Sequence, residues 1–230
     1  MAARLIEAIR AVQPVGAYRL AGWSFGGTLV FEIARQLIGA DQTVEFLGLI
    51  DPPPRTTKIE IPVQDADFLR EIVMSRHPHQ ARSHPLNVID PGDFDAMARK
   101  CRELSLLPEQ FDSLGLAELR EVLSRYRLHI EASNQYEADF IGIPVHLFIA
   151  EEGGTARRSR AEASRGWSTV VPDGQLSIVP VAGDHYSMVV NPHVVGLGAA
   201  LSHAIRQASR GQPALLAPML SQLGNPSVDD

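Results

Sequence analysis

Apolar positions along the chain follow two spacings, and each spacing predicts one kind of element. The first twelve residues carry apolar side chains at helical spacing, and this pattern ends before Pro14, which predicts an amphipathic helix. A short strand over residues 17–21 and a helix that ends near Gly39 are expected next. Continuous apolar runs, typical of strands buried on both faces of a parallel sheet, follow at residues 44–50, 144–150 and 176–181.

A last helix is expected over about residues 193–209, with Val194, Val195, Leu197, Leu201 and Ile205 facing inward. Between residues 52 and 143 no run of the strand type occurs, but helical patterns recur at 68–74, 93–106 and 116–136. A helical insertion between two strands accounts for this arrangement, and at the carboxyl edge of a sheet it would act as a lid.

The pattern therefore predicts an α/β fold with a mostly parallel sheet and helices on both faces. We expect one domain over residues 1–210 with a lid insertion at about 55–140. Residues 211–230 are rich in Pro, Ser, Gln and Asn, so they are expected to form a loosely ordered tail.

Composition narrows the class of protein. The chain of 230 residues suits a single α/β domain, and its net charge of -6 with dispersed Arg lacks the basic stripe that nucleic-acid binding needs. The single Cys101 forms no internal disulfide, which fits a reducing compartment. Charges interrupt the apolar residues near the N-terminus, so neither a signal peptide nor a membrane span is expected there. These features predict a cytoplasmic protein with no nucleic-acid or membrane partner.

One pentapeptide carries a chemical signal. Gly22-Trp23-Ser24-Phe25-Gly26 fits Gly-x-Ser-x-Gly and lies between the expected strand and the expected helix, which is the context of a nucleophile elbow. Ser24 is then the candidate nucleophile, and the amide of Phe25 is the candidate oxyanion donor at the start of the helix. Gly22 and Gly26 are expected to be required because a side chain on either flank would collide with the strand or the helix.

A serine nucleophile needs a base, and the base needs an orienting acid. Of the eight histidines, His185 is the best candidate because it follows the last strand through a Gly-Asp turn. The acid remains open between Asp51, which ends one apolar run and precedes three prolines, and Glu151 or Glu152, which end another. All three would lie at the carboxyl edge of the sheet, beside Ser24.

A His-rich piece of the insertion raises the question of a metal. It contains His77, His79 and His84, but no nearby acidic or Cys residue completes a ligand set. We expect a solvated loop, with no metal and no cofactor of the chain's own.

These motifs together resemble the thioesterase domains that end nonribosomal peptide and polyketide synthetases. The resemblance rests on the Tyr-Arg-Leu-Ala-Gly-Trp-Ser-Phe-Gly-Gly elbow, the later Leu-Ile-Asp-Pro and the Gly-Asp-His-Tyr-Ser-Met stretch around His185. It implies an α/β-hydrolase fold with a helical lid over an acyl channel, and it assigns the catalytic acid to Asp51. It also implies a substrate presented as a thioester on the phosphopantetheine of an acyl or peptidyl carrier protein.

Ser24, His185 and Asp51 would then form an acyl-enzyme that water or an internal nucleophile resolves, giving a free acid or a macrocycle. Trp23 flanks the nucleophile and is expected to line the acyl channel, with core packing as the alternative. Two other functions stay open: a general serine esterase or lipase, and a catalytically impaired remnant that acts as a binding module.

One part of the family's pattern, at its N-terminal side, has no counterpart in this sequence. Family members carry earlier strands and a His-Pro-Gly-Gly-like loop with a second oxyanion donor, and nothing in this sequence matches them. The strand at residues 17–21 is therefore expected at an open sheet edge. Because one missing oxyanion donor costs roughly 2 to 4 kcal/mol of transition-state stabilisation, we expect weak or absent activity of the isolated chain unless a partner supplies these strands.

Overall fold

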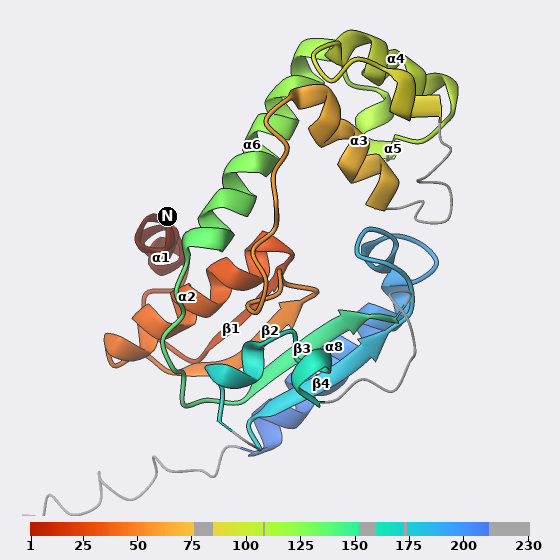
Figure 1. The fold of residues 1–230 in the computed structure, drawn as a ribbon. Coiled ribbons are helices and arrows are strands. Elements are labelled where there is room, and N and C mark those ends of the chain that lie inside the picture. Colours follow the sequence, from red (N-terminus) through yellow and green to blue (C-terminus); the bar gives the residue numbers. More distant parts are fainter. Residues whose placement is uncertain (76–84, 108, 152–159, 173, 212–230) are drawn as a thin grey trace, which may run out of the picture. The chain divides into compact units, whose positions relative to one another are not determined.

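The computed structural model describes residues 1–75, 85–107, 109–151, 160–172 and 174–211. The chain divides into two compact units (Figure 1). The first unit comprises Met1–Pro52, Phe140–Ser159 and Ser168–Asp230, and the second comprises Pro53–Asp139 and Arg160–Trp167.

The first unit is built on a parallel four-stranded sheet in the order β1-β2-β3-β4. The strands are β1 (Tyr18–Trp23), β2 (Val44–Ile50), β3 (Val145–Ala150) and β4 (Leu176–Val181). The apolar runs predicted as strands are confirmed, and β1 extends two residues beyond its predicted end because Trp23 still pairs with Ile50. β1 lies at one edge of the sheet that the described residues form.

Helices cover both faces of this sheet (Figure 1). Phe46 and Ile50 of β2 pack with Leu197 of α8 (Val194–Gly211). Because side chains alternate along a strand, Leu47 and Leu49 point to the other face, where α2 (Phe25–Gly39) contacts β1 and β2. The α/β architecture with a parallel sheet is thereby confirmed.

The first unit contains two shorter helical elements besides α2 and α8. α1 (Ala2–Val12) packs against α2, and η5 (Ser187–Val189) precedes α8. Val195 was expected to face inward, but its side chain is 70% exposed. Leu197 and Ala204, about two turns apart on α8, are buried, and Leu201 and Ile205 pack against the same cluster.

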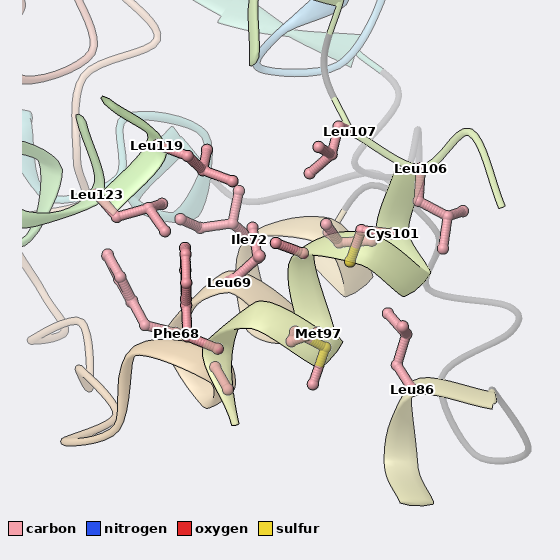
Figure 2. Packing of buried hydrophobic residues seen from close by; sticks show 14 of the residues in the cluster. Phe68, Leu69, Ile72, Leu86, Met97, Cys101, Leu106, Leu107, Leu119 and Leu123 are labelled. Atoms are coloured by element: carbon pink, nitrogen blue, oxygen red, sulfur yellow. The ribbon is translucent and has the colours of Figure 1, made fainter. Parts of the chain in front are cut away.

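The second unit has its own helical core (Figure 2). Phe68 and Leu69 of α3, Met97 and Cys101 of α4, and Leu119 of α6 are all at most 2% exposed. The helical patterns predicted there are confirmed. Its elements are α3 (Asp65–Ser75), η2 (Pro85–Val88), α4 (Phe94–Glu103), α5 (Glu109–Asp112), α6 (Leu116–Gln135) and α7 (Arg160–Ala163), with η4 (Trp167–Thr169) at the boundary.

A segment distant in sequence completes the second unit. The amide of Arg55 donates to the carbonyl of Arg165 at 2.8 Å, and the indole of Trp167 donates to the carbonyl of Pro53 at 3.3 Å. Gly166 takes φ +84°, and a Cβ there would lie 2.7 Å from Thr56. Close packing at this glycine joins residues 160–167 to the segment after β2, which sequence patterns did not indicate.

Several predictions fall on residues outside the described ranges: His77, His79, His84 and Glu152, and the tail 211–230 apart from Gly211, which ends α8. That α3 to α6 act as a lid stays a prediction. In the part of the chain that the structure describes, no helix is both long and apolar enough to cross a bilayer. Among the same residues, no three His, Cys, Asp or Glu side chains gather as metal ligands.

Candidate active site

Ser24 lies in a strained turn between β1 and α2. Its backbone takes φ 56° and ψ -127°, a region that costs a residue other than glycine of order 1–3 kcal/mol. Two hydrogen bonds hold this turn: the amide of Ser24 donates to Ile50 at 2.9 Å, and the amide of Gly27 donates to the carbonyl of Ser24 at 2.9 Å. The strand, the turn and the helix match the predicted nucleophile elbow.

The glycine requirement is only partly as predicted. A Cβ on Gly22 would lie 2.1 Å from the carbonyl oxygen of Gly26, so glycine is required there. A Cβ on Gly26 would meet nothing within 4 Å, and the prediction for that position is wrong. The close approach falls on Gly27 instead, where a Cβ would lie 3.0 Å from the Cβ of Pro52. Pro52, which lies just after β2, therefore makes position 27 the second place in this turn where a side chain is crowded.

Asp51 follows the last residue of β2 and is held from two sides. Its backbone also has a positive φ, 42°, and its amide donates to the carbonyl of Phe148 at 2.7 Å. The side chain is 3% exposed, and its Oδ1 accepts a hydrogen bond from the amide of Ala150 at 3.0 Å. Oδ1 is thus turned toward β3, and Oδ2 faces the histidine.

His185 connects the other two residues. Its Nδ1 lies 2.6 Å from Asp51 Oδ2, and its Nε2 lies 3.0 Å from Ser24 Oγ. A carboxylate only accepts, so Nδ1 carries the proton and Nε2 is left to accept from the serine hydroxyl. The structure thus brings together the three residues that the sequence proposed for this chemistry.

The turn that carries His185 is stiffened by its neighbours. Asp184 Oδ1 accepts from the amides of Tyr186 at 2.7 Å and Ser187 at 2.9 Å, and Ser187 Oγ accepts from the amide of Asp184 at 2.8 Å. Gly183 has φ +98°, and a Cβ there would lie 2.7 Å from Ser187 Oγ. Asp184 and Ser187 were not predicted as site residues, although an Asp just before a turn is a known signal for such side-chain to backbone bonds.

Trp23 and Phe25 flank the nucleophile in different ways. The Trp23 ring stacks on the His185 ring with centroids 5.0 Å apart and planes 27° apart, and its Nε1 donates to the His185 carbonyl at 3.1 Å. Phe25 begins α2, so its amide belongs to the end of the helix that carries partial positive charge. A substrate contact by Trp23 and an oxyanion role for Phe25 both stay predictions.

Glu151, the one alternative acid that lies within the described residues, receives no support from the geometry. Glu151 follows β3 with an exposed side chain, and no hydrogen bond or ion pair of the described residues joins it to His185, whereas Asp51 is joined at 2.6 Å. Elsewhere, burial lowers the pKa of His146, whose ring stacks on Phe46 inside the sheet. The stacking is typical of a histidine that packs as part of the core.

The sequence is similar to known proteins over most of its length. A family model described as "Thioesterase domain" matches residues 1–197. The chain is 43% identical over 199 residues to N-(5-amino-5-carboxypentanoyl)-L-cysteinyl-D-valine synthase of Penicillium rubens, a match to 85% of this chain and 4% of that synthase. It is 26% identical over 223 residues to the non-reducing polyketide synthase stmB of Aspergillus ustus, a match to 87% of this chain and 10% of that synthase. The chain thus spans only a small fraction of these relatives' length.

Solved structures give the same result for the fold. A four-domain nonribosomal peptide synthetase bound to AMP and glycine matches with a TM-score of 0.67 and 25% identity, over 88% of this chain and 15% of that one. The NocB thioesterase domain, in covalent complex with a fluorophosphonate nocardicin G analogue, matches with a TM-score of 0.60 and 24% identity, over 91% and 73%. These similarities show the α/β-hydrolase fold that the sequence predicted.

Proposed function

This chain belongs to the thioesterase domain family, whose model matches residues 1–197, and we propose that it releases an acyl or peptidyl chain from the phosphopantetheine thioester of a carrier protein. The observation that carries the proposal is the connected row of Ser24, His185 and Asp51, joined at 3.0 Å and 2.6 Å. Support for a carrier protein comes from the relatives, which are peptide and polyketide synthases far longer than this chain.

Acylation follows from the positions of the three side chains. Ser24 Oγ attacks the thioester carbonyl carbon while His185 Nε2 accepts the hydroxyl proton. Asp51 holds Nδ1–H and stabilises the imidazolium. The carbon–sulfur bond then breaks, and His185 returns the proton to the leaving sulfur, so that the pantetheine thiol departs and the acyl group stays as an ester on Ser24.

Charge develops on the carbonyl oxygen during both steps. We assign its stabilisation to the amide of Phe25, the first residue of α2, aided by the helix macrodipole. Water activated by His185 then releases a carboxylic acid, and a hydroxyl or amine of the bound chain releases a macrocycle instead. Neither step requires a metal or a cofactor of this chain, because the phosphopantetheine belongs to the carrier. The cytoplasmic location stays a prediction.

The first test is labelling of Ser24. A fluorophosphonate forms a covalent complex with the NocB domain, so the same class of reagent suits this chain. We expect one adduct on Ser24 by intact mass and peptide mapping, no adduct in Ser24→Ala, and strongly reduced labelling in His185→Ala. A folded protein that takes up no reagent would contradict the catalytic proposal and favour the non-catalytic binding module.

The second test separates a thioesterase from a general esterase. Acyl-pantetheine thioesters and oxygen esters of the same acyl group are compared by kcat/KM. We expect the thioester to be preferred, and the preference to increase when the thioester is presented on a carrier protein. Preference for the oxygen ester would support a general serine esterase or lipase instead.

A further inference from the structure

Trp23 occupies a position that links the sheet to the base. It is the last residue of β1, pairs with Ile50 in the parallel register and immediately precedes Ser24. Its ring packs against the cluster of buried residues that includes Phe46 and Phe148. The strand that fixes the nucleophile therefore also fixes the indole.

The indole contacts His185 in two independent ways. Its ring lies face to face with the imidazole, with centroids 5.0 Å apart, and its Nε1–H donates to the backbone carbonyl of His185 at 3.1 Å. Tyr186 completes the arrangement, edge-on to His185 at 5.0 Å and to Trp23 at 6.3 Å. One face of the base and its backbone are thus both held by a residue of β1.

The two hydrogen bonds of the imidazole leave one motion free. Bonds to Asp51 and Ser24 fix the line through Nδ1 and Nε2, but they do not prevent the ring from tilting about that line. A flat ring stacked on one face opposes the tilt, and it also lies where a cation–π interaction would stabilise the imidazolium formed during acylation.

We propose that Trp23 is a positioning residue for the base: its indole fixes the ring plane and the backbone of His185, and it stabilises the charged ring in the transition state. This inference rests on the proposed function, because it assumes that His185 acts on Ser24. It differs from the role in the acyl channel expected from the sequence. A positioning role predicts a loss in kcat, whereas a substrate contact predicts a rise in KM that depends on the acyl chain.

The test uses two substitutions of graded severity. Trp23→Phe keeps a stacking ring and loses the N–H donor, and Trp23→Leu loses both. Because a cation–π contact is worth about 2- to 30-fold and a small misplacement of a catalytic group costs about 100-fold, we expect Trp23→Leu to lower kcat by roughly 30- to 100-fold. The phenylalanine variant should recover most of that loss, and KM for short and long acyl-pantetheines should stay within about twofold.

Phe46→Leu is the matched control. Phe46 belongs to the same cluster but stacks on His146 rather than His185, so it reproduces the loss of core packing without touching the base. Equal losses of kcat in Phe46→Leu and Trp23→Leu would overturn the proposal, and so would a change confined to KM or an unchanged Trp23→Leu.

Fluorophosphonate labelling of the same variants separates this inference from the proposed function. The labelling rate of Ser24 depends on His185 but not on any thioester, so Trp23→Leu should slow labelling even if no thioester proves to be a substrate. A wild-type chain that labels but hydrolyses no acyl thioester would end the thioesterase proposal alone. A folded wild-type chain that does not label would end both.

Discussion

Replacing Asp51 by asparagine changes one atom of the proposed site and leaves its backbone undisturbed. Asp51 has φ 42°, a conformation that asparagine tolerates well. The amide oxygen will occupy the place of Oδ1, because there it accepts the 3.0 Å bond from the amide of Ala150. The NH2 group then faces His185 Nδ1. A donor at that place requires Nδ1 to accept, which puts the ring proton on Nε2 and directs it at Ser24.

The structure sets the size of the effect. If the asparagine side chain rotates by half a turn, its oxygen faces Nδ1 and the productive tautomer of His185 returns. The backbone amide of Ala150 then loses its acceptor, which costs about 1–3 kcal/mol, so this rotamer is roughly 5- to 150-fold less populated. Loss of the negative charge beside the imidazolium removes a further 2 kcal/mol or so, about 30-fold. Together they predict a fall of about 10³ in the acylation rate, within about tenfold of the fall of about 10⁴ in kcat known for this change in a serine protease.

Single-turnover labelling of Ser24 by a fluorophosphonate depends on the same activation of the serine by His185 and Asp51, so its rate should fall by a similar factor. Urea unfolding should show a change in the free energy of unfolding of less than about 1 kcal/mol, because the bond to Ala150 is kept. Glu151→Gln is the control, since this exposed carboxyl follows the neighbouring strand, and it should stay within about twofold of wild type. An Asp51→Asn variant that labels within tenfold of wild type, or a larger loss in Glu151→Gln, would refute the reasoning.

Three further predictions use other parts of the chain. Gly22→Ala should lower the free energy of unfolding by about 3 kcal/mol, because its Cβ would lie 2.1 Å from a carbonyl oxygen. Gly26→Ala, a helical position with open space around its Cβ, should leave the protein as stable or raise this free energy by up to about 1 kcal/mol, and equal urea midpoints of the two variants would contradict this. A hydrogen bond from Arg19, 2.6 Å away, lowers the pKa of Glu45, so this pair stabilises the fold above the ordinary glutamate pKa of about 4.3 and loses its effect as the pH falls through the lowered value. Glu45→Gln should therefore be less stable than wild type at pH 7, and the difference in urea midpoint should shrink as the pH falls through the lowered pKa of Glu45. A difference independent of pH would contradict the assignment. Burial raises the pKa of the Cys101 thiol to about 11. Alkylation by iodoacetamide at pH 8 should therefore be at least about 100-fold slower in the native protein than in urea. Rapid alkylation of the native protein would show that the core of the second unit is open.

Much of this molecule is predictable because its signals are local. The apolar runs of β2, β3 and β4 are continuous and bounded by turn residues, so their limits could be read almost to the residue. The elbow is a pentapeptide with a fixed context, and His185 follows the last strand directly. Parallel strands end at one edge, and this topological rule brings residues 24, 51 and 185 close in space although more than a hundred positions separate the last two.

The missed features depend on contacts between segments that are distant in the chain. The need for glycine at position 27 rather than 26 arises from Pro52, which no pattern within α2 can indicate. The stacking of Trp23 on His185 joins β1 to the turn after β4. The segment 160–167 joins the second unit through carbonyls at Pro53 and Arg165. Backbone bonds of this kind leave no mark in hydrophobic periodicity.

The two positive φ angles at Ser24 and Asp51 have an evolutionary consequence. Each residue directly follows one of two neighbouring parallel strands, β1 and β2, and each backbone conformation is one that glycine would adopt more easily. Costs of order 1–3 kcal/mol at each position are large beside the 5–15 kcal/mol that typically separates folded from unfolded domains. Selection for abundance alone therefore favours replacing both side chains, so a lineage relieved of the need for catalysis is expected to lose this pair early and to gain stability as it does so.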